Sequence, residues 1–161
     1  MTETSSTQGA DAGDASRGFT ITRILDAPRE LVFKAWTEPE HFTHWFGLPG
    51  STLPVATISM DVRPGGTWSA LMFDGPERTE LPFAGKYLEV VEPERLVLTL
   101  AHPGDPTNPN VEVMTVVLTD LGDKTEMVFQ QSGHLSEEEY AQVKEGNTIF
   151  FGRLADYLAQ V

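Results

Sequence analysis

The chain of 161 residues is 40% hydrophobic, which suits one domain with a single sizeable core. Its formal net charge of -13 disfavours contact with phosphate backbones and anionic membrane surfaces, so nucleic acid is not an expected partner. The lack of cysteine excludes disulfides, thiolate nucleophiles and cysteine-ligated metals, and no apolar run approaches the ~18 residues of a membrane span.

The first seventeen residues are rich in Thr, Ser, Gly, Ala and Asp and carry no large apolar side chain after Met1. Such a segment buries too little surface to offset its ordering entropy. We therefore predict a disordered tail over residues 1–17 and a folded domain over residues 18–161. No signal peptide is recognisable, so we expect a cytoplasmic protein without membrane insertion.

Alternating apolar and polar residues predict a first strand from Phe19 to Ile24. Two short helices follow, because Pro28 suits a first helical turn, Pro39 restarts the helix and Gly47 ends it. Further strands are predicted at residues 55–62, 67–73, 83–91, 95–102, 111–119 and 124–132. A long amphipathic helix closes the chain, beginning at a capping box from Ser136 to Glu139.

Short connections between the later strands favour an antiparallel sheet, and the long helix needs one face of that sheet to cover. The expected fold is therefore α+β and of the helix-grip type. A curved antiparallel sheet of about seven strands wraps around the long C-terminal helix, with two short helices after the first strand.

Four segments, taken in order, resemble one known family: residues 24–47, Asp61 to Gly66 with Trp68, residues 85–97, and Gly146 with residues 153–158. This family is the domain named after the activator of the heat-shock protein 90 ATPase, within the START-like (SRPBCC, pollen-allergen-like) superfamily. The resemblance covers nearly all of residues 18–160 and implies a ligand-holding cup. Similar sequences usually have Trp after the helix glycine, where this chain has Asn147.

Strand parity predicts a polar row at the end of the apolar inner face of the sheet. His102 shares the inward face of Leu100, and Glu112 shares that of Met114. We expect a register with Leu100 opposite Met114 and His102 opposite Glu112. In the next pair of strands we expect Val116 opposite Met127, Met114 opposite Phe129 and Glu112 opposite Gln131. Asn147 lies four residues from Val143 and from Phe151 and so points at the sheet.

The functional interpretation of this row is a polar patch in the cavity, with Glu112 and His102 as a candidate acid–base pair. The alternative is a frayed, hydrated sheet end. No catalytic residue is firmly assigned. The predicted ligand-binding residues are Trp68, Met72, Leu98, Leu100, His102, Glu112, Met114, Val116, Met127, Phe129, Gln131, Asn147, Phe150, Phe151 and Leu154.

Other polar and aromatic residues have more ordinary interpretations. Asp61 and Arg63 are expected to form an ion pair at a strand end, although a carboxylate site is the alternative. The three tryptophans are expected to pack in the core. His41 and His44 lack the two further ligands of a metal site, so we expect neither a metal nor a cofactor.

Two classes of function remain. We favour a non-enzymatic module that binds a small apolar or amphipathic molecule between sheet and helix. The alternative is a cyclase, dehydratase or hydrolase that uses the Glu112/His102 pair. A chaperone cofactor is implied by the family name alone. The chain is expected to be a monomer or a homodimer.

Overall fold

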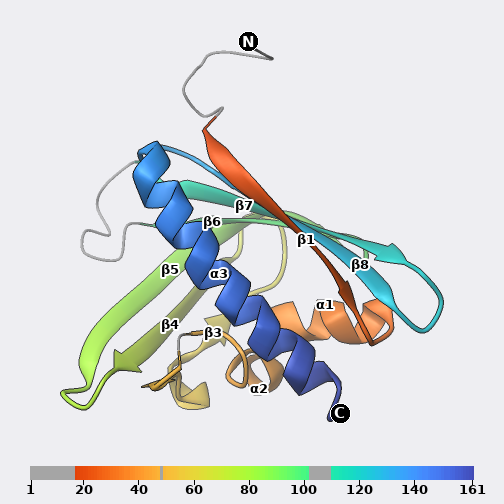
Figure 1. Cartoon of the computed structure of the whole chain (residues 1–161), viewed down its shortest axis with the longest axis horizontal. Coiled ribbons are helices and arrows are strands. Elements are labelled where there is room, and N and C mark those ends of the chain that lie inside the picture. Colours follow the sequence, from red (N-terminus) through yellow and green to blue (C-terminus); the bar gives the residue numbers. More distant parts are fainter. Residues whose placement is uncertain (1–16, 48, 102–109) are drawn as a thin grey trace.

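Figure 1 shows a computed structural model of the chain, which describes residues 17–47, 49–101 and 110–161. The predicted tail, apart from Arg17, lies outside the described residues, and so does His102. The elements follow in the order β1 (Gly18–Leu25), α1 (Arg29–Thr37), α2 (Pro39–Phe42), β2 (Ser51–Thr52), a 3-10 turn (Val55–Thr57), β3 (Ser59–Met60), β4 (Thr67–Asp74), β5 (Thr79–Val91), β6 (Arg95–Leu100), β7 (Glu112–Asp120), β8 (Thr125–Ser132) and α3 (Glu137–Leu158).

The described strands form one eight-stranded antiparallel sheet in the order β1-β8-β7-β6-β5-β4-β2, with β3 also paired to β4. The long helix α3 crosses one face of this sheet diagonally (Figure 1). The predicted α+β helix-grip fold is therefore confirmed. Two of the eight strands, β2 and β3, contain only two residues each.

The strand predicted at residues 55–62 is wrong over most of its length, because the chain forms a 3-10 turn followed by the short β3. Thr57 explains the difference. Its hydroxyl donates to the carbonyl of Pro54 at 2.7 Å and accepts from the N–H of Leu71 at 3.2 Å. Side-chain bonds of this kind compete with the regular pairing of a strand.

The predicted register between the central strands is wrong by two residues. Leu98, not Leu100, lies opposite Met114, and Gln131, not Phe129, lies opposite Met114 on the other side. The predicted four-residue turn of the β7–β8 hairpin is displaced by one residue, because Asp120 pairs with Thr125, and the Asp120 carboxylate accepts from the N–H of Gly122 in this turn at 2.8 Å. A shift of two residues keeps every side chain on its predicted face.

The core lies between the sheet, α1 and the C-terminal half of α3. Trp36, Trp45 and Trp68 are at most 3% exposed, which confirms that they pack in the core. Trp36 contacts Phe151 of α3 and Phe129 of β8, both at ring-centroid distances of 6.0 Å. These contacts hold α1 and one end of α3 against the same part of the sheet.

Two local predictions about polar residues are also confirmed. Ser136 and Glu139 form the capping box at the start of α3, with bonds of 3.1 and 2.9 Å. Arg63 Nε pairs with both carboxylate oxygens of Asp61 at 3.0 and 2.9 Å on an exposed surface. The capping box fixes the residue at which α3 begins after β8, and this start determines where the helix lies over the sheet.

Candidate ligand-binding site

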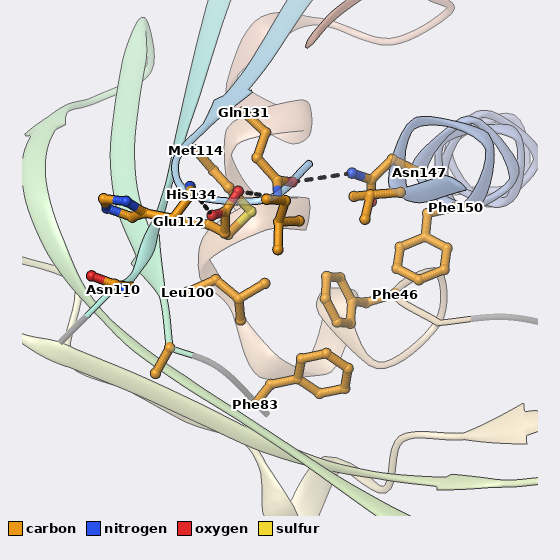
Figure 2. Close-up of a pocket in the computed structure, with 14 residues that line it drawn as sticks. Phe46, Phe83, Leu100, Asn110, Glu112, Met114, Gln131, His134, Asn147 and Phe150 are labelled. Carbon is orange, nitrogen blue, oxygen red and sulfur yellow. Dashed lines mark hydrogen bonds between the residues drawn. The ribbon is translucent and has the colours of Figure 1, made fainter. Parts of the chain in front are cut away.

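A cavity of about 430 Å³ lies between α3 and the inner face of the sheet (Figure 2). This volume falls within the range of small-molecule sites. Its walls are mainly apolar side chains from α3, three strands and the segment after α2. The apolar lining residues are Phe46, Phe83, Leu100, Ala101, Met114, Leu135, Val143 and Phe150.

Glu112 of β7 forms the polar corner of the cavity and is only 9% exposed. Its Oε1 accepts hydrogen bonds from the Tyr140 hydroxyl at 2.8 Å and from Gln131 Nε2 at 3.0 Å. Its Oε2 accepts one from the backbone N–H of His134 at 3.0 Å. The carboxylate is therefore fixed by three donors that come from β8, α3 and the segment between them.

The polar corner continues onto α3 through two amides. Gln131 is 2% exposed, and its Oε1 accepts from Asn147 Nδ2 at 3.4 Å while its Nε2 donates to Glu112. Figure 2 shows this chain of bonds running from β7 to α3. Gln131 and Asn147 both line the cavity, so the network presents polar atoms to any molecule inside it.

Gly133 is the residue that makes room for the Glu112 carboxylate. A Cβ at this position would overlap Oε2 and would lie 2.6 Å from the carboxyl carbon. Distances under 3.0 Å are essentially never seen for a real Cβ, so the carboxylate would have to move. The close approach of backbone and side chain explains glycine at this position.

Tyr140 acts as a donor in this network. Its side chain is 3% exposed, and burial raises its pKa well above the usual value for tyrosine. The hydrogen bond to Glu112 raises the pKa further, because it favours the protonated phenol. The Tyr140 hydroxyl thus keeps its proton and holds the carboxylate throughout the neutral pH range.

The model of the Activator of Hsp90 ATPase homolog 1-like protein family matches residues 26–159. The chain belongs to this family. Its family model spans every element from α1 to α3, including those that line the cavity. No curated protein has a significantly matching sequence.

Solved structures share the fold of this family member. Protein CV1439 of Chromobacterium violaceum is 23% identical, with a TM-score of 0.78 over 88% of this chain and 96% of that one. Protein NE0264 of Nitrosomonas europaea is 27% identical, with a TM-score of 0.75 over 91% and 97% of the two chains. The AHSA1 protein SPO3351 of Silicibacter pomeroyi is 17% identical, with a TM-score of 0.75 over 89% and 99%.

The predicted ligand-binding residues of this family member fall into two groups. Six line the cavity: Leu100, Glu112, Met114, Gln131, Asn147 and Phe150. Eight are buried in the core and do not line it: Trp68, Met72, Leu98, Val116, Met127, Phe129, Phe151 and Leu154. His102, the other member of the candidate acid–base pair, lies outside the described residues.

The structure adds site residues that the sequence did not indicate. Tyr140 lies at an apolar position of the amphipathic pattern of the last helix, and the sequence signal for its role is that a buried tyrosine hydroxyl usually has a hydrogen-bond partner. Phe46 and Phe83 come from segments far from the predicted polar row, and only the tertiary fold brings them to the cavity. His134 contributes a backbone N–H, which no residue pattern indicates.

Other possible sites in the described part of the chain have local structural roles. His41 Nδ1 lies 2.6 Å from the Tyr157 hydroxyl, and the exposed ring of His44 stacks on Tyr157 at 4.9 Å. No three His, Asp or Glu side chains of the described residues gather closely enough to hold a metal ion. Among the same residues, no helix is both long and apolar enough to cross a membrane.

Proposed function

We propose that this protein binds a small, mainly apolar molecule in the cavity between α3 and the sheet, without converting it chemically. The observation that carries the proposal is the combination of an apolar cavity of about 430 Å³ with one ordered polar corner. Ligand sites are typically concave and apolar, with a few well-placed polar groups. The polar corner would orient the ligand, and the walls would supply most of the affinity.

Aromatic side chains form the wall opposite the polar corner. Phe46 contacts Phe83 at a centroid distance of 5.5 Å and Phe150 at 5.1 Å. Each 100 Å² of apolar ligand surface removed from water against such a wall contributes about 2.5 kcal/mol. Burial against all three rings is thus the main contribution that would offset the freedom of movement lost by the ligand.

The hydrogen bonds of Glu112 favour binding over catalysis. Three donors hold the carboxylate in one position, as suits recognition of a fixed ligand group. Its titratable neighbour Tyr140 has a raised pKa and so serves as a donor and not as a base. A chaperone partner, inferred from the family name, stays a prediction.

A neutral fluorescent probe tests the proposal directly. N-phenyl-1-naphthylamine becomes fluorescent in apolar surroundings, and we expect the parent protein to bind it with saturable, single-site behaviour. Native mass spectrometry of the freshly purified protein is expected to show a co-purifying small molecule. Absence of both signals would contradict a binding function for this cavity.

The variant Asn147→Trp tests whether the probe binds in this cavity. The indole would fill the space beside Phe150 and remove the bond to Gln131, so we expect affinity for the probe to fall at least tenfold. Thermal stability is expected to hold or rise, because the new side chain fills a void. Glu145→Trp places the same side chain on an exposed position of α3 and is expected to bind like the parent. Equal affinity in both variants would place the site elsewhere.

A further inference from the structure

Glu112 is a buried carboxylate whose described partners are all neutral. They are a phenol, a carboxamide and a backbone N–H, and no ion pair joins Glu112 to any described Lys or Arg side chain. Buried charges in proteins are normally paired. A carboxylate at the edge of a cavity, with no Lys or Arg of the described residues paired to it, leaves a place for a positive charge supplied by the ligand.

The described lining of the cavity contains an acidic side chain but no Lys or Arg. Of the described residues that line it, only Glu112 and the exposed His134 are ionisable, and none is Lys or Arg. The whole chain carries a formal charge of -13. A ligand that ends in a carboxylate or phosphate would thus place its charge against Glu112, with no Lys or Arg among the described lining residues to bind it.

The polar corner also has acceptor positions left for a donor-rich group. An ionised carboxylate offers about four lone-pair positions, and the three bonds to Glu112 occupy two on Oε1 and one on Oε2. Asn147 uses its Nδ2 toward Gln131, while its Oδ1 accepts from no described residue. An ammonium group has three donors and no acceptor, which matches such a corner.

The geometry points to an amphipathic amine as the ligand: an apolar body against the phenylalanine wall and a protonated amine at Glu112. This inference rests on the proposed function, because it names the ligand class of the same cavity. Glu112 supplies the counter-charge, and Asn147 supplies a second acceptor through Oδ1. Gln131 holds both in place through its two amide atoms.

Three ligands of equal chain length distinguish the effect of the ligand's charge on affinity from the effect of its apolar contacts. Decylamine and decanoate, each below its critical micelle concentration at neutral pH, and decanol, below its solubility limit, would compete with bound N-phenyl-1-naphthylamine. Decylamine is expected to displace the probe at a concentration at least tenfold lower than decanol, with decanoate the weakest. Equal potency of decylamine and decanol, or stronger binding of decanoate, would overturn the inference. Because these arms use the unaltered protein, they do not depend on the folding of any variant.

Glu112→Gln tests the assigned residue, and Glu145→Gln is its matched control. Both variants remove one negative charge, but Glu145 is exposed on α3 and does not line the cavity. The decylamine-to-decanol preference is expected to fall to less than threefold in Glu112→Gln and to stay at the parent value in Glu145→Gln. A preference that survives in Glu112→Gln would mean that the general negative charge of the protein attracts the amine. Failure of the parent to bind the neutral probe, together with the absence of a co-purifying molecule, would instead reject the binding function itself.

Discussion

Gly133 and Tyr140 are the two residues through which the position of Glu112 can be tested. A methyl group on Gly133 overlaps Oε2, and the Tyr140 hydroxyl holds Oε1 at 2.8 Å. Gly133→Ala must push the carboxylate away from at least one of its three donors. We expect a loss of about 1–3 kcal/mol in the free energy of unfolding, measured by urea denaturation, because buried polar groups are left unpaired.

A double-mutant cycle distinguishes this effect from a local backbone defect. Tyr140→Phe alone is expected to destabilise the protein by about 1–3 kcal/mol, as removal of a hydrogen bond to a carboxylate does. Because Gly133→Ala and Tyr140→Phe disturb the same carboxylate, the double variant is expected to lose less than the sum of the two single losses. Strict additivity would show that Gly133 acts independently of Glu112.

At the residue scale, strand parity was the useful signal in the sequence. It placed Glu112 and Gln131 on one face, and the structure joins them by a hydrogen bond even though the predicted register was two residues off. Helical spacing likewise predicted that Asn147 points at the sheet, and in the structure its amide bonds to Gln131. The donor from His134 and the space at Gly133 depend on the path of the chain between β8 and α3, which no residue pattern specifies.

At the element scale, the long strands and α3 were predictable, and the short connections were not. Strong apolar alternation and a capping box marked β7, β8 and α3 in the sequence. The two-residue strands β2 and β3 exist only because β4 is beside them, so they leave no pattern of their own. The hydrogen bonds of Thr57 and the displaced turn after β7 likewise depend on tertiary or local side-chain contacts.

Two glycines give opposite predictions for the elements that contain them. Gly152 lies within α3, and an added Cβ would meet nothing within 4 Å. Gly152→Ala is therefore expected to raise the free energy of unfolding by about 0.5–1 kcal/mol, because alanine loses less backbone entropy in a helix. A fall in stability on thermal or urea denaturation would mean that this turn of α3 needs glycine for another reason.

Gly85 in β5 has no such freedom. An added Cβ would overlap the carbonyl oxygen of Thr99 in β6 and lie 2.6 Å from Trp68 Nε1, which donates to the same oxygen at 2.9 Å. The obstacles are backbone and a buried indole, so neither can yield easily. Gly85→Ala is expected to cost at least 1–3 kcal/mol, in line with strained overpacking. A neutral result would show that β5 and β6 separate more readily than their pairing indicates.

At the scale of the whole molecule, the cavity exists because α3 is packed at its two ends and not in the middle. Tyr140 is buried near its start, and Phe151, Leu154 and Leu158 are buried toward its end. Between them lie Gly146, which has no side chain, and Asn147, whose short amide reaches Gln131 of β8 but is too small to fill the space beside it. In the sequence, this part of α3 was indicated by Asn147, which stands where similar sequences usually have tryptophan. The size of the space follows only from the packed fold.

The three tyrosines of the chain give a whole-molecule prediction for alkaline pH. Burial raises the pKa of Tyr87, Tyr140 and Tyr157 above the usual value of about 10, and the charge of Asp61 adds to the effect at Tyr87. Above that pH the unfolded chain releases phenolic protons that the folded protein retains. Unfolding is then coupled to proton release, so the contribution of these tyrosines to stability is constant below about pH 10 and is lost as the pH rises further.

Tyr87→Phe provides the sharpest test of this dependence. The Tyr87 hydroxyl is buried and has no hydrogen-bond partner among the described residues, so its removal is expected to leave stability at pH 7 unchanged or slightly raised. Urea denaturation between pH 8 and pH 12 is expected to show a steeper loss for the parent than for Tyr87→Phe. The variant lacks one of the groups whose proton is lost on unfolding, and every other titratable group is common to both proteins. Identical pH profiles for the two proteins would mean that Tyr87 ionises in the folded state as it does in water.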